Sequence, residues 1–139
     1  MRKFIFACIH NAGRSQMSAA LFNQYVDPYK AQAISAGTQP ADQVHPVVVD
    51  AMREIGIDLT AAKPQKLTAE LAQDADTLIT MGCGDECPYV PGIRRDDWPL
   101  PDPKGQEIEV VRQTRDEIKS RVVALLEREN LLQNSKLTD

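Results

Sequence analysis

The sequence has no apolar run that approaches the roughly 20 residues a helix needs to cross a bilayer. Its first apolar stretch, FIFACI at residues 4–9, follows Arg2 and Lys3 and so resembles the start of a secretion signal. That stretch is too short for such a signal, and no small-residue cleavage site follows it. We therefore expect a cytoplasmic protein that has no membrane partner.

The sequence also lacks any dense cluster of positive charge. Its 16 Lys and Arg residues are spread along the chain against 20 Asp and Glu residues, which gives a net charge of −4. Since affinity for nucleic acid comes mainly from concentrated positive charge, we expect no nucleic-acid partner. A small anionic substrate bound at a local site remains compatible with this charge.

Cysteine is scarce, at three residues, and the odd number argues against the disulfide framework of a secreted protein. There is no internal repeat and no convincing linker. With 42% hydrophobic and 26% charged residues, the composition is that of an ordinary globular chain. We expect a single domain over residues 1–139, a frayed tail at 130–139, and a monomer.

The order of the expected elements indicates the fold class. Strands are predicted at 3–8, 31–35, 76–81 and, more weakly, 93–98. Helices are predicted at 15–25, at 46–55, in a short turn after Thr68, and at 108–129. Strands that alternate with helices predict an α/β fold: a three-layer, open, parallel four-stranded sheet with helices on both faces. Ligands bind such sheets at the carboxyl ends of strands, where Cys8, Cys83 and Asp102 are expected.

The stretch CIHNAGRS, residues 8–15, has the form C-x5-R-S between an expected strand and an expected helix. A turn of this length can direct successive backbone N–H groups inward around a tetrahedral oxyanion, and the helix start adds positive potential. Arg14 can bind two of the oxygens, and the same field favours the thiolate form of Cys8. Cys8 is therefore a candidate nucleophile, although a strand-end cysteine can also be a purely structural residue. The expected oxyanion site consists of Ile9, His10, Asn11, Ala12, Gly13, Arg14 and Ser15.

The loop CIHNAGRSQM resembles the active-site loop of the low-molecular-weight protein tyrosine phosphatase superfamily, and more narrowly the arsenate reductases built on that fold. The likeness continues through SAGTQP at 35–40, MREIGIDL at 52–59, TMGCGDECP at 80–88 and DDWPLPDPKGQ at 96–106. It implies a phosphatase-like fold and arsenate, or a phosphate-like oxyanion, as the substrate. It also implies that Asp102, which precedes Pro103, is the acid that protonates the departing oxygen. Asp96 and Asp97 are second choices for that role.

Cys83 and Cys87 are the residues that distinguish a thiol relay from other possible functions. A C-x3-C metal site would need two further ligands, and Cys8 and His10 already belong to the loop of residues 8–15, which we call the anion loop. We therefore expect no metal. We also expect no tightly bound cofactor. A second possibility is that Cys83 and Cys87 have no catalytic role. The resemblance implies a third, a relay in which Cys83 attacks Cys8 and Cys87 then attacks Cys83, regenerated by a thioredoxin-like reductant.

Two features qualify this interpretation. The three-residue gap between Cys83 and Cys87 also resembles relatives that a low-molecular-weight thiol resolves, so mycothiol, bacillithiol or glutathione is an alternative reductant. Ala19 stands where some reductases have a potassium-binding Glu, so we predict no potassium requirement. A tyrosine phosphatase that hydrolyses phosphate monoesters, or an oxyanion-binding redox sensor without turnover, also remains open. Outside these motifs, we expect His45 to be an exposed residue at a helix start and Trp98 to serve packing.

Overall fold

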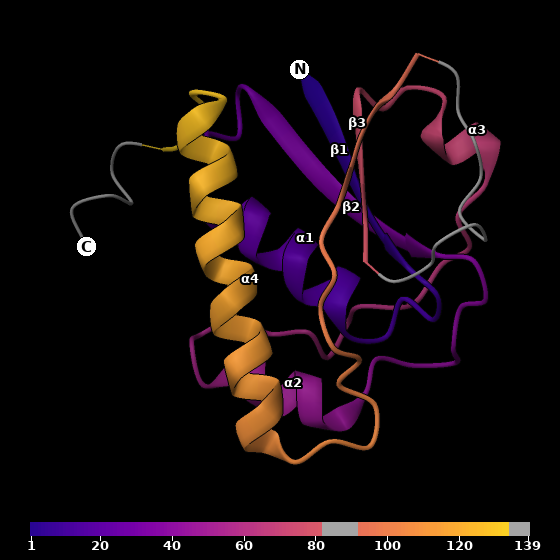
Figure 1. The fold of residues 1–139 in the computed structure, drawn as a ribbon, viewed down its shortest axis with the longest axis vertical. Coiled ribbons are helices and arrows are strands. Elements are labelled where there is room, and N and C mark those ends of the chain that lie inside the picture. Colours follow the sequence, from indigo (N-terminus) through magenta and orange to yellow (C-terminus); the bar gives the residue numbers. More distant parts are fainter. Residues whose placement is uncertain (82–91, 134–139) are drawn as a thin grey trace.

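The computed structural model describes residues 1–81 and 92–133. Within them lie four strands, namely β1 (Arg2–Cys8), β2 (Ala31–Gly37), β3 (Thr77–Thr80) and β4 (Arg94–Asp97). The helices are α1 (Arg14–Tyr25), α2 (Pro46–Arg53), α3 (Ala69–Ala72) and α4 (Ile108–Arg128). All four strands run parallel in the order β2-β1-β3-β4, which confirms the expected open α/β sheet (Figure 1).

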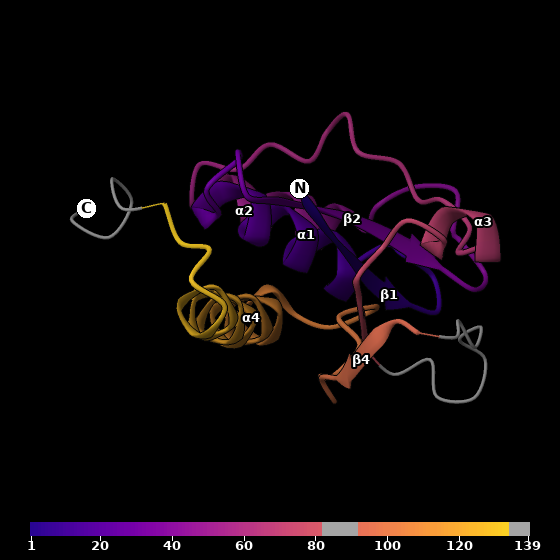
Figure 2. The ribbon, with the colours of Figure 1, turned by 90° about the horizontal axis from the view of Figure 1, so that it is seen from above.

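The two faces of the sheet are covered unequally. Phe4, Phe6 and Cys8 of β1 face a large apolar core with α1, α2 and α4, whereas Ile5 and Ala7 face a smaller core that includes α3. Figure 2 shows the three longer helices on one side of the strands and α3 on the other. Helices therefore lie on both faces as expected, and the central strand is apolar from Phe4 to Cys8, where both its faces are buried.

Helix α4 carries an apolar stripe that packs on the larger core. Val111, Ile118, Val122 and Leu125 are all buried, as their spacing predicts. Trp98, which follows β4, is also buried, and its ring lies 5.5 Å from the ring of Phe6. This confirms the packing role expected for Trp98.

Helix α2 is shorter than its sequence pattern predicts. It ends at Arg53, and Gly56 follows with a left-handed φ of 81°. Ile55, which the pattern places on the buried face, is instead 40% exposed because the chain has already left the helix. The turn at Gly56 therefore overrides the apolar spacing.

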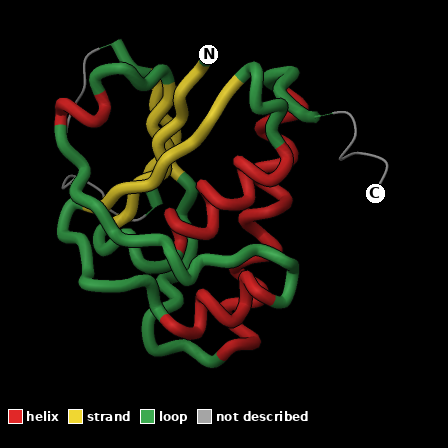
Figure 3. Tube along the Cα trace, turned by 180° about the vertical axis from the view of Figure 1, so that it is seen from behind, coloured by secondary structure: helices red, strands yellow, loops and turns green. Residues whose placement is uncertain are grey.

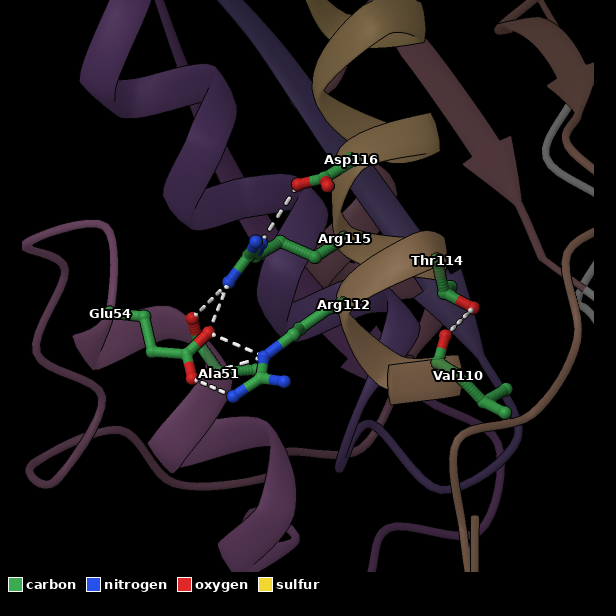
Figure 4. Close-up of polar contacts among 7 residues, drawn as sticks. All are labelled: Ala51, Glu54, Val110, Arg112, Thr114, Arg115 and Asp116. Atoms are coloured by element: carbon green, nitrogen blue, oxygen red, sulfur yellow. Dashed lines mark hydrogen bonds and ion pairs between the residues drawn. The ribbon is translucent and has the colours of Figure 1, made fainter. Parts of the chain in front are cut away.

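An ion-pair cluster joins α2 to α4. Glu54, just after α2, accepts hydrogen bonds from Arg112 and Arg115, and Arg115 also donates to the carbonyl of Ala51 at 2.7 Å (Figure 4). Hydrogen bonds from the two guanidinium groups lower the pKa of Glu54 to about 2. The start of α4 is thereby fixed against the end of α2.

Candidate active site

Cys8 lies at the carboxyl end of the central strand, opposite Gly37 of β2, with the end of β3 on its other side. The loop after β1 follows it directly and leads into α1. Figure 3 shows loops gathered at the ends of the strands that lie away from the N-terminus. The sheet thus places the loop after β1 at the edge where parallel sheets bind ligands.

The sulfur of Cys8 is buried, with 2% of the residue exposed, and lies 2.9 Å from the hydroxyl oxygen of Ser15. That same oxygen accepts a hydrogen bond from the side-chain amide of Asn11 at 2.7 Å. Because Asn11 is the donor in that bond, the hydroxyl proton of Ser15 is free to point at the sulfur. Ser15 can therefore stabilise negative charge on Cys8.

Asn11 fixes the shape of the loop. It is fully buried and adopts a left-handed φ of 50°, a conformation that Asn tolerates better than most residues. Its Oδ1 accepts hydrogen bonds from the backbone of Gln65 at 2.9 Å and from the side chain of Gln16 at 3.2 Å. The sequence predicts no role for Gln16 or Gln65. Gln16 adjoins the motif and could have been suspected, but nothing in the sequence connects Gln65 to a loop 54 residues earlier.

The backbone of residues 8–13 directs its carbonyl groups away from the loop centre. The carbonyls of Cys8, Ile9, His10 and Ala12 accept hydrogen bonds from the segment 38–45. By contrast, the N–H groups of residues 9–15 donate to no acceptor within residues 1–81 and 92–133. Since buried N–H groups are nearly always paired, this set forms a cradle of donors suited to an oxyanion.

Arg14, the first residue of α1, is buried beside this cradle. Its Nη1 donates to the carbonyl of Leu100 at 3.1 Å, and its Nη2 lies 3.8 Å from Oδ2 of Asp102. Its Nε is buried and has no partner among the described residues. A guanidinium with an unpaired, buried N–H at the edge of the cradle is ready to bind a further acceptor.

Asp102 lies beside Arg14, and its side chain is 46% exposed. Asp96 and Asp97, the two alternatives for the acid, form hydrogen bonds with other residues. Asp97 accepts from the hydroxyl of Thr80 at 2.7 Å, and Asp96 accepts from the indole N–H of Trp98 at 3.3 Å. The structure therefore places Asp102, rather than Asp96 or Asp97, next to the cradle.

His45 differs from its expectation as an exposed residue. It is partly buried at the start of α2, its backbone N–H donates to Ala12, and its ring approaches Gly13. Burial lowers the pKa of His45; the charges of Lys104 and His10 act in the same direction, and the Asp102 carboxylate acts against them. His10 instead turns toward the carbonyl of Gln39, 3.0 Å from its Nδ1.

Cys83 and Cys87 lie outside the described residues. Within the described ones, no group of three His, Cys, Asp or Glu side chains is arranged to hold a metal ion. In the same part of the chain, none of the helices has both the length and the apolar character of a membrane span.

The sequence model for low molecular weight phosphotyrosine protein phosphatases matches residues 3–136, nearly the whole chain. The chain belongs to this family. Within curated proteins, a putative arsenate reductase of Halobacterium salinarum is 39% identical over 132 residues, covering 92% of this chain and 93% of that protein. A glutaredoxin arsenate reductase of Synechocystis is 35% identical over 129 residues, covering 91% and 97%.

Solved structures of the phosphatase family share the fold. A thioredoxin-dependent arsenate reductase of Corynebacterium glutamicum superposes with a TM-score of 0.79 at 36% identity. The match covers 92% of this chain and 61% of that one, so this chain spans about three fifths of its length. The family assignment and the superposition together confirm the phosphatase-like fold that the motifs implied.

Proposed function

We propose that this chain is an enzyme that reduces arsenate to arsenite, with Cys8 as its nucleophile. The observation that supports this most directly is a buried thiol, 2.9 Å from the hydroxyl of Ser15, beside N–H groups and an Arg14 Nε that have no partner among the described residues. Arsenate is a tetrahedral oxyanion that such donors can bind. Relatives named as arsenate reductases, matched over most of this chain, support the choice of reaction.

In the first step, arsenate would bind in the cradle with its oxygens on the loop N–H groups and on Arg14. The Cys8 thiolate forms a bond to arsenic, and one arsenic–oxygen bond breaks. Asp102 supplies a proton, so the oxygen leaves as water rather than as hydroxide. The donors around the cradle stabilise the charge that develops on the remaining oxygens.

In the second step, a thiolate attacks the sulfur of Cys8. A sulfur–sulfur bond forms, the sulfur–arsenic bond breaks, and arsenic leaves with the electron pair as arsenite. We propose Cys83 as the attacking thiolate and Cys87 as the thiol that then moves the disulfide to Cys83–Cys87. The two electrons that arsenic gains thus come from a pair of thiols.

We propose thioredoxin as the reductant of that disulfide, which the superposition on a thioredoxin-dependent relative supports. A low-molecular-weight thiol such as mycothiol, bacillithiol or glutathione is the alternative. Either reductant requires a compartment that keeps thiols reduced, so we propose a cytoplasmic location. We propose no tightly bound cofactor and a monomeric enzyme.

NADPH oxidation in the presence of arsenate tests this proposal. The assay supplies thioredoxin with its reductase in one arm, and a low-molecular-weight thiol with a glutaredoxin in the other. We expect arsenate-dependent NADPH oxidation that Cys8→Ser abolishes. Loss of turnover in Cys83→Ser and Cys87→Ser with thioredoxin supports the relay, whereas retention only with the small thiol favours the alternative. No NADPH oxidation in either arm would contradict the arsenate function.

Hydrolysis of phosphate monoesters is the second candidate, and the family assignment favours it. The cradle, Cys8 and Asp102 are sufficient for it, because phosphate and arsenate share shape and charge. A phosphatase would keep full activity in the double variant Cys83→Ser/Cys87→Ser. Fast ester hydrolysis that survives this change, without arsenate turnover, would establish the second candidate.

A further inference from the structure

Gly13 lies against the segment that carries the proposed acid. A β-carbon built on Gly13 would come within 2.5 Å of Cγ and 3.2 Å of Cδ of Pro103. Real β-carbons essentially never come that close to another heavy atom, so the buried ring of Pro103 occupies the space that a side chain at position 13 would fill. The absence of a side chain at residue 13 is thus required for this approach.

Arg14, the next residue, holds the same segment from the cradle side. Its Nη1 donates to the carbonyl of Leu100, and its Nη2 faces Asp102. We call residues 99–105 the acid segment. Two adjacent residues of the anion loop therefore contact it, Gly13 by close packing and Arg14 by its guanidinium.

The carboxylate of Asp102 is oriented by its own turn. Oδ1 accepts a hydrogen bond from the backbone N–H of Lys104 at 3.0 Å, and Oδ2 is the oxygen directed toward Arg14. Pro103 lies between Asp102 and Lys104 in the sequence, so the position of its ring also fixes the position of the Asp102 carboxylate. A displaced Pro103 would carry Oδ2 away from the cradle.

We propose that Gly13 is a positioning residue for the acid: its missing side chain lets Pro103 pack on the anion loop and so places Oδ2 of Asp102 over the bound oxyanion. This inference rests on the proposed role of Asp102. A proline ring is rigid and forms part of the backbone, so it cannot avoid an added methyl group by a change of rotamer. Gly13→Ala should therefore move the acid segment as a unit.

Aryl phosphates with different leaving groups separate acid catalysis from the rest of the chemistry. Phenolate leaves slowly without a proton, whereas dinitrophenolate leaves readily, so only phenyl phosphate depends strongly on the acid. We expect Gly13→Ala to lower kcat/KM for phenyl phosphate by about 100-fold, and that for 2,4-dinitrophenyl phosphate by less than about threefold. Asp102→Asn should show the same pattern. An equal loss for both esters, or no loss for either, in Gly13→Ala would overturn the inference.

Removal of the ring that the new methyl group meets tests whether Gly13 and Pro103 act through one contact. We expect Gly13→Ala/Pro103→Gly to lose no more activity toward phenyl phosphate than Pro103→Gly alone, because either change abolishes the same contact. Pro101→Gly is the matched control, because Pro101 is an exposed proline of the same segment and is not among the atoms nearest Gly13. Its effect should multiply with that of Gly13→Ala, whereas independent losses for Gly13→Ala and Pro103→Gly would overturn the inference.

Crystal structures of the unaltered chain and of Gly13→Ala give a readout that needs no activity. We expect the variant to keep the anion loop but to move Pro103, with Asp102 Oδ2 well beyond its 3.8 Å separation from Arg14 Nη2. Pro103 unmoved in the variant would overturn the inference. If Asp102→Asn shows no dependence on the leaving group, the acid role in the proposed function fails, and the crystal structures still decide whether Gly13 positions the segment. Should Gly13→Ala fail to fold, Pro103→Gly alone is expected to lower phenyl phosphate hydrolysis selectively, and a uniform effect on both esters would overturn the inference.

Discussion

The hydroxyl of Ser15 lies between the amide of Asn11 and the sulfur of Cys8. This arrangement leaves the hydroxyl proton free to be donated to a Cys8 thiolate, and a hydrogen bond to a charged group stabilises that group more than it stabilises the neutral form. At the scale of single residues, the reactivity of the thiol therefore depends on one neighbouring oxygen as well as on the cradle.

We expect Ser15→Ala to slow alkylation of Cys8 by iodoacetamide at pH 7 by about tenfold, because a charge-assisted hydrogen bond is lost. Mass spectrometry of the peptide that contains Cys8 measures the rate without interference from the other thiols. Ser18→Ala is the matched control, since Ser18 is also buried in α1 but donates to the carbonyl of Arg14. Unchanged alkylation in Ser15→Ala would show that Ser15 does not stabilise the thiolate.

The anion loop, with the strand before it and the helix after it, could be predicted from the sequence because the C-x5-R-S spacing and its flanking patterns are local. The partners of the loop residues could not. Gln65 reaches Asn11 across 54 positions, and Leu100 reaches Arg14 across 86. Such contacts depend on how distant backbone segments meet, and a polar side chain such as Gln65 gives no periodic signal.

Among the elements, α2 and α4 are joined by the cluster around Glu54. Because its pKa is about 2 in the folded chain and 4.5 in its ordinary state, Glu54 stabilises the fold above pH 4.5. That stabilisation is lost as the pH falls from 4.5 toward 2.

We expect Glu54→Gln to lower the melting temperature at neutral pH and to flatten its decline between pH 5 and about 2, since the titrating carboxylate is gone. Thermal unfolding followed by circular dichroism across this range measures both effects. Glu127→Gln, at an exposed position of α4, is the matched control and should follow the unaltered chain. A parallel decline in all three proteins would show that the pairing contributes nothing to acid stability.

The elements themselves were largely predictable, because buried strands and the apolar stripe of α4 carry strong periodic patterns. Gly56 is typical of a helix end, and it does adopt a left-handed φ just after α2. The exposure of Ile55 was not predictable, because its spacing fits the apolar face of a helix that in fact ends at Arg53. His45 was likewise misjudged. The residue precedes a helix, where exposure is usual, but it lies against Ala12 and Gly13 of the anion loop and is partly buried there.

At the scale of the whole molecule, the two apolar cores share β1. Phe4 and Phe6 belong to the core under α1 and α4, and Ile5 and Ala7 to the core near α3. Neither core can lose its order while the strand between them stays intact. The single domain expected from chain length is therefore also expected to unfold as one unit.

Differential scanning calorimetry measures this cooperativity. We expect one transition with a calorimetric enthalpy of about 100 kcal/mol, equal to the van't Hoff enthalpy. Two transitions, or a calorimetric enthalpy well above the van't Hoff value, would show that the α3 side melts independently.

Strand β4 forms one border of the sheet and consists of Arg94, Arg95, Asp96 and Asp97, all exposed. Strands at the border of a sheet can pair with other chains, and short, charged border strands disfavour such pairing. Any second chain that aligned there would have to place its own side chains beside two cations and two anions within four residues. We therefore expect the strand that leads the backbone toward Asp102 also to disfavour edge-to-edge pairing between copies of this chain.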